Sequence, residues 1–390
     1  MLSSSSFGML RNRGWLLRIG NQPARAGRHS RLLKPGFAAN PIGEVFRRLS
    51  RSNHYNVLVL VEGAMTMRCR LSAGVLFLCL CGVAQAFSQA NSDVPAKDKN
   101  AVTADITVTL LGSGGGPNPN PRRFGPSILV QAGGQTLLFD CGRGASIRLA
   151  QLGILLGQVR NVFLTHLHSD HIIGLPDLYL TGWGAQGRKT PFRVWGPSGT
   201  KDMMEHLQRA FDFDIHIRRD VDEKFVKEGI EVSSTDIKEG VIFQEGGVSV
   251  TAFHVDHRPI EPAFGYRVDY AGRSVAMSGD TRFSENLIEH AKGVDLLIHE
   301  AIDPVEVRAR LSKSGAAQTE IDNIVAHHIT AEEAGVVFAR VKPRLAVYAH
   351  ISDADLVTPA RKSYSGPLET GEDLMVIRIG DTVTVRRVNQ

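Results

Sequence analysis

The chain of 390 residues contains only four cysteines, and three of them, Cys69, Cys79 and Cys81, lie close together near the N-terminus. Cys141 is the one cysteine that follows residue 86. No intramolecular disulfide can therefore form within that larger part of the chain. Its fold must depend on a hydrophobic core, and its length is ample for one.

The larger part of the chain also lacks an excess of positive charge. Residues 1–86 contain eleven Arg and one Lys but only two acidic residues, whereas the remainder contains 33 basic and 38 acidic residues. The formal net charge of +5 and the pI of about 9.1 therefore reflect the N-terminal segment. The slightly acidic composition of the remainder gives no indication of a nucleic-acid-binding surface.

A hydrophobic run long enough to span a membrane comfortably is also missing near the N-terminus. The apolar run Leu71–Ala84 follows Arg68 and Arg70 and leads into an Ala-Gln-Ala sequence. This pattern predicts a signal peptide over residues 65–86 that is cleaved after its last residue, Ala86. The mature protein would then be periplasmic or secreted and free of the membrane. A membrane-anchoring helix is the alternative.

The segments on either side of the predicted signal differ in character. Residues 1–64 are rich in Arg and Ser and poor in acids, as mitochondrial transit peptides are. Because a transit peptide directly before a secretory signal would be unusual, we favour a non-native leader translated from a start codon assigned too early. Residues 87–104 are predicted to form a flexible linker, and residues 105–390 the folded domain.

Predicted strands and helices alternate without an internal repeat along the folded domain, which is typical of a layered α/β protein. The segment 219–246 is charged and weakly periodic, and we expect it to be a surface insertion. Strands are predicted at residues 106–111, 127–130, 136–139, 159–164, 192–195, 248–253, 264–268, 274–277, 296–298 and 345–348. Helices are predicted at 145–152, 200–211, 285–291 and 330–341, and a closing hairpin at 374–388.

The run His166-Leu167-His168-Ser169-Asp170-His171 places four metal-capable side chains within six positions. It follows the apolar residues 162–164, which indicate a buried strand, and precedes a Gly-Leu-Pro turn at residues 174–176. Neutral imidazoles suit Zn²⁺, and a carboxylate can serve a second metal or a bound water. So dense a polar cluster beside a buried strand would be costly without a metal, and the run therefore predicts a metal site.

Further candidate ligands follow other predicted strands. His257, Asp280 and His350 each come shortly after a strand ends. Side chains delivered from several strand ends converge on one edge of a sheet sandwich, where a site can be open to substrate. We favour His257 over the nearby His254 because His257 lies in the turn beyond its strand.

An ordered set of motifs spans residues 106–388. The motifs are GSGGG at 112–116, LFDCGRG at 138–144, LTHLHSDH at 164–171, HRPIEPAFGYR at 257–267, SGDT at 278–281, LLIHEA at 296–301, HHITAEEAG at 327–335 and AHIS at 349–352. With this set the chain resembles the metallo-β-lactamase superfamily, in the branch that contains ribonuclease Z and is similar to arylsulfatases. The resemblance implies a four-layer αβ/βα sandwich, a hydrolase domain with a dinuclear metal site at one edge.

The resemblance also implies two zinc ions per chain, with other divalent metals as alternatives. One ion would be held by His166, His168 and His257. The other would be held by Asp170, His171 and His350, and Asp280 would bridge the two.

The chemistry that the resemblance implies is hydrolysis of an anionic ester by a hydroxide that bridges the metals. Asp170 would both bind a metal and hold this hydroxide. His328 would protonate the departing oxygen as a general acid, and Glu300 would orient His328. The adjacent His327 would have no role.

Phosphodiester cleavage of the ribonuclease Z type is the first functional expectation, with precursor tRNA as that family's best-known substrate. The predicted export signal and the acidic domain argue against tRNA. An exported arylsulfatase or other small-ester hydrolase is the main alternative, and a lactonase is a further one. The resemblance also implies a homodimer. Arg143 is a candidate contact for an anionic substrate, with a surface salt bridge as the alternative, and Tyr179, Trp183 and Phe264 are candidate pocket-lining residues.

Overall fold

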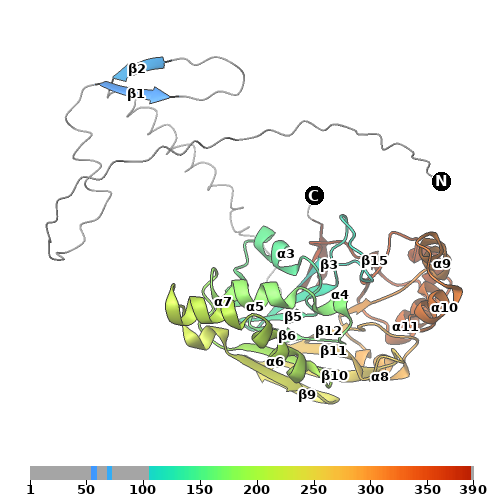
Figure 1. The fold of residues 1–390 in the computed structure, drawn as a ribbon. Coiled ribbons are helices and arrows are strands. Elements are labelled where there is room, and N and C mark those ends of the chain that lie inside the picture. Colours follow the sequence, from blue (N-terminus) through green and yellow to red (C-terminus); the bar gives the residue numbers. More distant parts are fainter. Residues whose placement is uncertain (1–53, 59–67, 73–104, 388–390) are drawn as a thin grey trace, which may run out of the picture. The chain divides into compact units, whose positions relative to one another are not determined.

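The computed structural model describes residues 54–58, 68–72 and 105–387 (Figure 1). The chain divides into two units, Met1–Lys99 and Asn100–Gln390. In the first unit, strands β1 (His54–Leu58) and β2 (Arg68–Ser72) pair in an antiparallel two-stranded sheet.

The predicted N-terminal segments lie mostly outside the described residues. Of the leader 1–64 only β1 is described, of the signal peptide 65–86 only β2, and the linker 87–104 lies wholly outside. Cleavage after Ala86 and export therefore stay predictions. Among the described residues, no helix is both long enough and apolar enough to cross a membrane.

The second unit is built on two sheets. The larger has eight strands in the spatial order β17 (Val383–Arg386), β16 (Val376–Ile379), β3 (Ile106–Gly112), β4 (Ser127–Ala132), β5 (Gln135–Phe139), β6 (Asn161–Phe163), β7 (Phe192–Gly196) and β8 (Val232–Asp236). The strands from β17 to β5 are antiparallel, and those from β5 to β8 are parallel.

The other sheet has seven strands in the order β15 (Leu368–Thr370), β14 (Leu345–Tyr348), β13 (Leu296–His299), β12 (Arg273–Met277), β11 (Ala263–Tyr270), β10 (Val248–Val255) and β9 (Gly240–Glu245). Strands β12 to β15 are parallel, and β9 to β12 are antiparallel. In both sheets, parallel strands thus bring the segments that follow them to a common edge.

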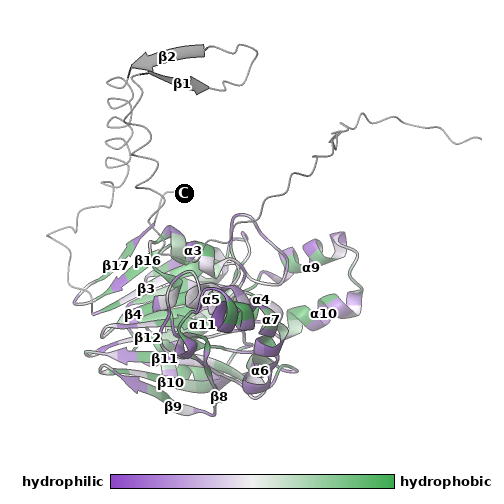
Figure 2. Cartoon of the chain, turned by 60° about the vertical axis from the view of Figure 1, so that its left-hand side comes forward, coloured by the Kyte–Doolittle hydropathy of each residue, from purple (hydrophilic) through white to green (hydrophobic). Residues whose placement is uncertain are grey.

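Three hydrophobic clusters hold four layers together. One cluster lies between the sheets, with Phe139 and Phe163 of one sheet packed near Tyr266 of the other. A second packs helices α3 (Ala145–Gln151), α5 (Leu175–Trp183) and α6 (Thr200–Ala210) on the eight-stranded sheet. A third packs α8 (Glu285–Ala291) and α11 (Ala331–Val341) on the seven-stranded sheet. Figure 2 shows hydrophobic residues, in green, along the strands of both sheets. The predicted αβ/βα sandwich is confirmed.

Two local predictions were wrong. The segment 219–246, expected to be a surface insertion, contains β8 and β9, which are edge strands of the two sheets. Both are mostly half-buried or exposed, so no clean apolar alternation marks them in the sequence. The expected turn at residues 174–176 instead begins α5, with Gly174 as N-cap and Pro176 in the first turn, where its missing N–H costs nothing.

The remaining helical segments were not predicted from the sequence patterns. They are α4 (Ser169–Ile172), α7 (Asp212–His216), α9 (Pro304–Lys313), α10 (Gln318–Ala326), α12 (Val357–Ala360) and the single turns η1 (Leu156–Gln158), η2 (Ile217–Val221) and η3 (Lys227–Ile230). Helix α11 does begin as predicted. The Thr330 hydroxyl accepts a hydrogen bond from Glu333 N at 3.2 Å, and Glu333 accepts one from Thr330 N at 3.0 Å.

A buried ion pair anchors the glycine loop at residues 112–116. Asp373 accepts hydrogen bonds from Ser113 N at 2.9 Å and from Phe124 N at 2.8 Å, and it pairs with Arg148 at 2.8 Å. These contacts tie the loop to α3 and to the segment that precedes β16. Because buried charges that have lost a partner are costly, this network keeps the loop in one position.

Candidate metal centre

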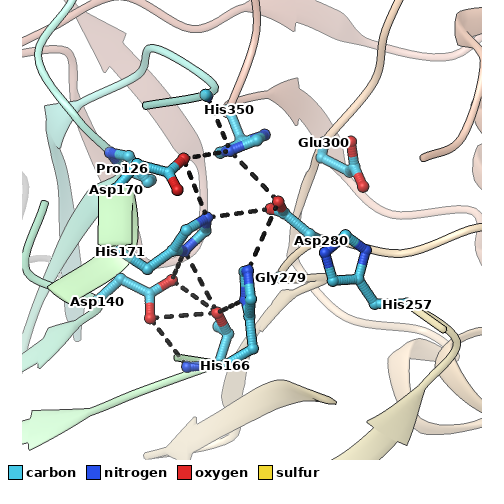
Figure 3. Close-up of polar contacts among 12 residues, drawn as sticks. Pro126, Asp140, His166, Asp170, His171, His257, Gly279, Asp280, Glu300 and His350 are labelled. Carbon is cyan, nitrogen blue, oxygen red and sulfur yellow. Dashed lines mark hydrogen bonds and ion pairs between the residues drawn. The ribbon is translucent and has the colours of Figure 1, made fainter. Parts of the chain in front are cut away.

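All seven predicted ligands lie together where strands of the two sheets end, and Figure 3 labels six of them, all except His168. Strand β6 leads into the His166–His171 run, and β10, β12 and β14 lead to His257, Asp280 and His350. Strands β12 and β14 belong to the parallel part of their sheet, which explains why residues so distant in sequence meet at one edge.

The metal-capable side chains form three overlapping groups. In each group the ligand atoms lie within 4.8 Å of one another. The groups are His166, His168, His257 with Asp280; Asp170, His171 with His350; and Asp280, His328 with His350. The first two groups match the two sets of ligands that the resemblance implies, and the Asp280 carboxylate contacts the imidazoles of both His171 and His350 (Figure 3).

The separations between these atoms are those of ligands around a shared ion. His350 Nε2 lies 3.4 Å from an oxygen of Asp170 and 3.4 Å from one of Asp280. His171 Nε2 lies 3.4 Å from Asp280, and His166 Nε2 lies 3.9 Å from it. Ordinary hydrogen bonds are about 2.7–3.2 Å long, whereas neighbouring ligands of a tetrahedral zinc ion are about 3.3 Å apart.

Several atoms in the cluster are buried without a hydrogen-bond partner among the residues that the structure describes. Among them are four atoms of predicted ligands, Nε2 of His166, His171 and His257, and Oδ1 of Asp280. A buried polar atom without a partner is costly, and native proteins rarely tolerate one. Because these four atoms face one another, a divalent metal fits the site and would satisfy them.

The electrostatics of the site also fit a cation. Asp170 and Asp280 expose only 10% and 3% of their side chains. Burial opposes protonation of His171 and His350, but the pKa of both is raised by the charge of Asp280 together with Asp140 beside His171 and the hydrogen bond of Asp170 to His350. Two buried carboxylates therefore demand positive charge, which a divalent ion can supply while the imidazoles remain neutral.

Other imidazoles of the site are held in the neutral form. Burial lowers the pKa of His166 well below its ordinary value and also lowers the pKa of His257. Neutral imidazole is the form that binds a metal. The tautomers are set by partners, since His166 Nδ1 lies 3.0 Å from Thr165 Oγ1 and His257 Nδ1 lies 2.9 Å from the carbonyl oxygen of His327. The expectation that His327 is without any role needs correction, because its backbone supports His257.

The supporting role of Asp140 was not predicted from the sequence. This carboxylate, in the left-handed conformation at φ 56°, follows β5 directly. It accepts hydrogen bonds from Thr165 N at 2.8 Å and from the Thr165 hydroxyl at 2.9 Å, and it lies 2.8 Å from His171 Nδ1. It therefore orients His171 with its Nε2 toward Asp280. The available signal was an acidic residue at the end of a buried strand.

Replacing Asp140 with Asn is expected to weaken metal binding by about 10–100-fold, because an amide orients and polarises His171 less well. Titration of zinc against a chromophoric chelator measures the change. Asp177→Asn is the matched control, since the Asp177 carboxylate accepts a hydrogen bond from Thr181 at the surface. Equal zinc affinity in the two variants would show that Asp140 does not support the site.

Glu300 and His328 form a pair beside the cluster. His328 Nδ1 lies 3.0 and 2.9 Å from the two carboxylate oxygens of Glu300, which is itself 2% exposed. Glu300 also accepts a hydrogen bond from Thr281 N at 2.5 Å, next to Asp280. Burial opposes protonation of His328, but the charge and hydrogen bond of Glu300 raise its pKa to about 9. His328 is thus oriented and supplied with a proton close to Asp280.

Two glycines allow the backbone to approach the site closely. Gly279 has a φ of 61°, and a Cβ there would lie 2.7 Å from the carbonyl oxygen of Phe264. A Cβ on Gly115 would lie 2.9 Å from Nδ1 of His350. The glycine loop therefore serves close packing against a predicted ligand.

A cleft of about 1070 Å³ opens beside Asp170. Arg143 lies on its wall, but the aromatic residues expected to line the pocket do not. Tyr179, Trp183 and Phe264 are buried in the core, where the Tyr179 hydroxyl donates to Ile230 O and the Trp183 indole to Val226 O. These three aromatic residues therefore pack between the layers of the fold, and the prediction that they line the pocket was wrong.

The fold and the clustered imidazoles and carboxylates define a metal-dependent hydrolase. Residues 135–351 match the beta-lactamase superfamily domain. Ribonuclease Z of Mycobacterium sp. (strain KMS) is 35% identical over 292 residues, which cover 72% of this chain and 99% of that protein. The chain belongs to the ribonuclease Z branch of the beta-lactamase superfamily.

Solved structures show the same fold. Human tRNase Z, short form, is 24% identical with a TM-score of 0.52, and the match covers 70% of this chain and 99% of that one. The metallo-beta-lactamase fold protein YhfI from Bacillus subtilis is 18% identical with a TM-score of 0.54, and the match covers 70% and 98%.

Proposed function

We propose that the protein is a phosphodiesterase of the ribonuclease Z type that uses two zinc ions to cleave RNA. One ion would be held by His166, His168 and His257, and the other by Asp170, His171 and His350, with Asp280 shared. The assignment of these ligands rests on the grouping of their atoms and on separations of 3.4–3.9 Å.

Zinc ions bound at such a site lower the pKa of water and neutralise charge on substrate oxygens. The residues of the chain supply orientation and proton transfer. Asp170, which lines the cleft, can accept a hydrogen bond from an attacking water and hold it in position. Asp280 is almost fully buried, and its negative charge would stabilise the zinc ions at the proposed site.

The observation that carries the proposal is the placement of His328. Its Nδ1 is held by Glu300, and one of its ring nitrogens lies within 4.8 Å of ligand atoms of Asp280 and His350. An ester oxygen that departs from this site as an alkoxide needs a proton. A histidine oriented by a buried carboxylate can donate one, and general acids of this kind contribute about 10²–10⁴-fold to rate.

RNA is the favoured substrate because relatives covered almost end to end are ribonuclease Z proteins. Precursor tRNA is the first RNA to test. A second candidate, a small aryl ester such as an aryl sulfate, is favoured by the acidic balance of the chain beyond residue 86, with 33 basic and 38 acidic residues. Export after Ala86 would separate the protein from tRNA and would therefore favour the second candidate. A homodimer stays a prediction.

The deciding experiment compares kcat/KM of the zinc-loaded full chain on an aryl phosphodiester and on the matching aryl sulfate. We expect the phosphodiester to be preferred by about 10²-fold or more, since the two carry the same charge but differ in the central atom, in the number of free oxygens and in the second ester group that only the phosphodiester has. Cleavage of a precursor tRNA would then be tested. A preference for the sulfate would reject the ribonuclease proposal in favour of the second candidate.

A further inference from the structure

Among the described residues 105–387, one arginine that lines the cleft beside Asp170 has no ion pair. Four arginines line the cleft. Arg122 and Arg123 pair with Asp353, and Arg310 pairs with Glu306. Arg143 is exposed and has no ion pair with any residue of the described range 105–387. Its positive charge is therefore available to a ligand in the cleft.

The backbone that carries Arg143 is fixed against the candidate metal centre. Gly125 N donates a hydrogen bond to the carbonyl oxygen of Arg143 at 3.1 Å. A Cβ on the preceding residue, Gly142, would lie 2.6 Å from the carbonyl oxygen of Asp170. The chain therefore contacts the Asp170 backbone one residue before Arg143. A cation based on a rigid segment loses less freedom when it binds an anion than one on a mobile loop.

Apolar side chains share the cleft with Arg143. Ile147, on α3, is 55% exposed, and Ile173, after α4, is 48% exposed. Large hydrophobic residues exposed in a concave surface commonly mark a ligand-binding site. An occupant that matches both features has a negative group for Arg143 and an apolar face for the isoleucines.

We propose that this cleft is a subsite for a second nucleotide of the RNA substrate, in which Arg143 binds the phosphate next to the one that is cleaved. Ile147 and Ile173 contact the base or sugar of that nucleotide. The inference rests on the proposed phosphodiesterase function. A nucleotide fits because it joins a phosphate to a flat ring whose faces are apolar, whereas a simple aryl ester has no second anion.

The test uses two chromogenic substrates that differ by one nucleotide. They are the p-nitrophenyl phosphodiesters of uridine monophosphate and of a diuridine dinucleotide, and the second carries one additional phosphate. For the zinc-loaded full chain, we expect Arg143→Ala to lower kcat/KM about tenfold on the dinucleotide ester. On the mononucleotide ester the loss should stay below about twofold, within the range of an uninvolved surface residue.

Salt dependence separates a phosphate contact from a structural effect. The fall of log kcat/KM with log salt for the dinucleotide ester should become shallower in Arg143→Ala, because a charge–charge contact that salt screens is lost. Arg143→Lys should keep most of the slope. Lys201→Ala, which removes one exposed charge from α6 outside the cleft, should leave slope and rate unchanged.

The outcomes distinguish failure of the subsite from failure of the proposed phosphodiesterase function. Equal losses on both esters, or an unchanged salt slope in Arg143→Ala, would overturn the subsite. Hydrolysis of neither ester by the unmodified chain would reject the phosphodiesterase function itself, on which the subsite depends. Ile147→Ser is a second probe, which should weaken the dinucleotide ester selectively without changing the salt slope.

Discussion

Asp280→Ala is expected to abolish metal binding and hydrolysis together. Asp280 lies 3.4 Å from both His171 and His350 and 3.9 Å from His166, so its carboxylate is the one that contacts members of both proposed zinc sites. The loss of zinc affinity should exceed the about 10–100-fold that follows loss of an outer partner. Turnover should fall by more than about 10³-fold, since removal of a single stabilising donor already costs about 10²–10³-fold.

Zinc content per chain, measured by elemental analysis after dialysis, tests this expectation together with kcat on an aryl phosphodiester. Asp269→Ala is the control, because Asp269 pairs with Arg267 on the exposed part of β11. Circular dichroism of both variants would establish that each is folded. Retention of two zinc ions in Asp280→Ala would contradict a shared ligand at this position.

His328→Ala is expected to keep the metals and lose most turnover on substrates with poor leaving groups. His328 is held by Glu300, and its removal deletes a proton donor without deleting a proposed ligand. On an ester with an alkoxide leaving group, kcat should fall by about 10²–10³-fold, within the range for general acids. On a p-nitrophenyl ester, whose leaving group departs without a proton, the loss should be less than about tenfold.

His327→Ala is the matched control for this prediction. The substitution removes the neighbouring imidazole but keeps the backbone carbonyl that accepts the hydrogen bond from His257. We expect near-normal turnover on both kinds of ester. Glu300→Gln should resemble His328→Ala in a milder form, because the amide orients the imidazole without its charge. An equal loss on good and poor leaving groups in His328→Ala would remove it from the role of proton donor.

The parts of the site that could be predicted from the sequence are those with a local signature. The His166–His171 run is compact, and imidazoles and carboxylates are the side chains that zinc requires. His257, Asp280 and His350 could be chosen because each follows an apolar run that indicates a strand. The four layers followed from the alternation of such runs with helical patterns and from the family resemblance.

The supporting contacts could not be predicted because they join residues whose local patterns carry no sign of their partners. Asp140 reaches His171 across two parallel strands, and Asp373 reaches Ser113 from 260 positions away. The strands at 232–236 and 240–245 escaped detection, since half-exposed edge strands need no hydrophobic alternation. The buried aromatic residues Tyr179 and Trp183 could not be told from pocket residues, because core and pocket draw on the same side chains.

The sequence by itself determined the chemistry that this chain can offer, a cluster of imidazoles and carboxylates placed at the ends of strands. Residue type and hydrophobic periodicity are local properties of the sequence, so they can be recognised without a structure. Tertiary structure alone decided which atoms face one another at 3.4 Å, which carboxylate orients His171, and that Arg143 stands without an ion pair, among the residues described, in a cleft beside Asp170. Such facts depend on the packing of two sheets against each other, because distances between segments far apart in the chain are set only when the layers close.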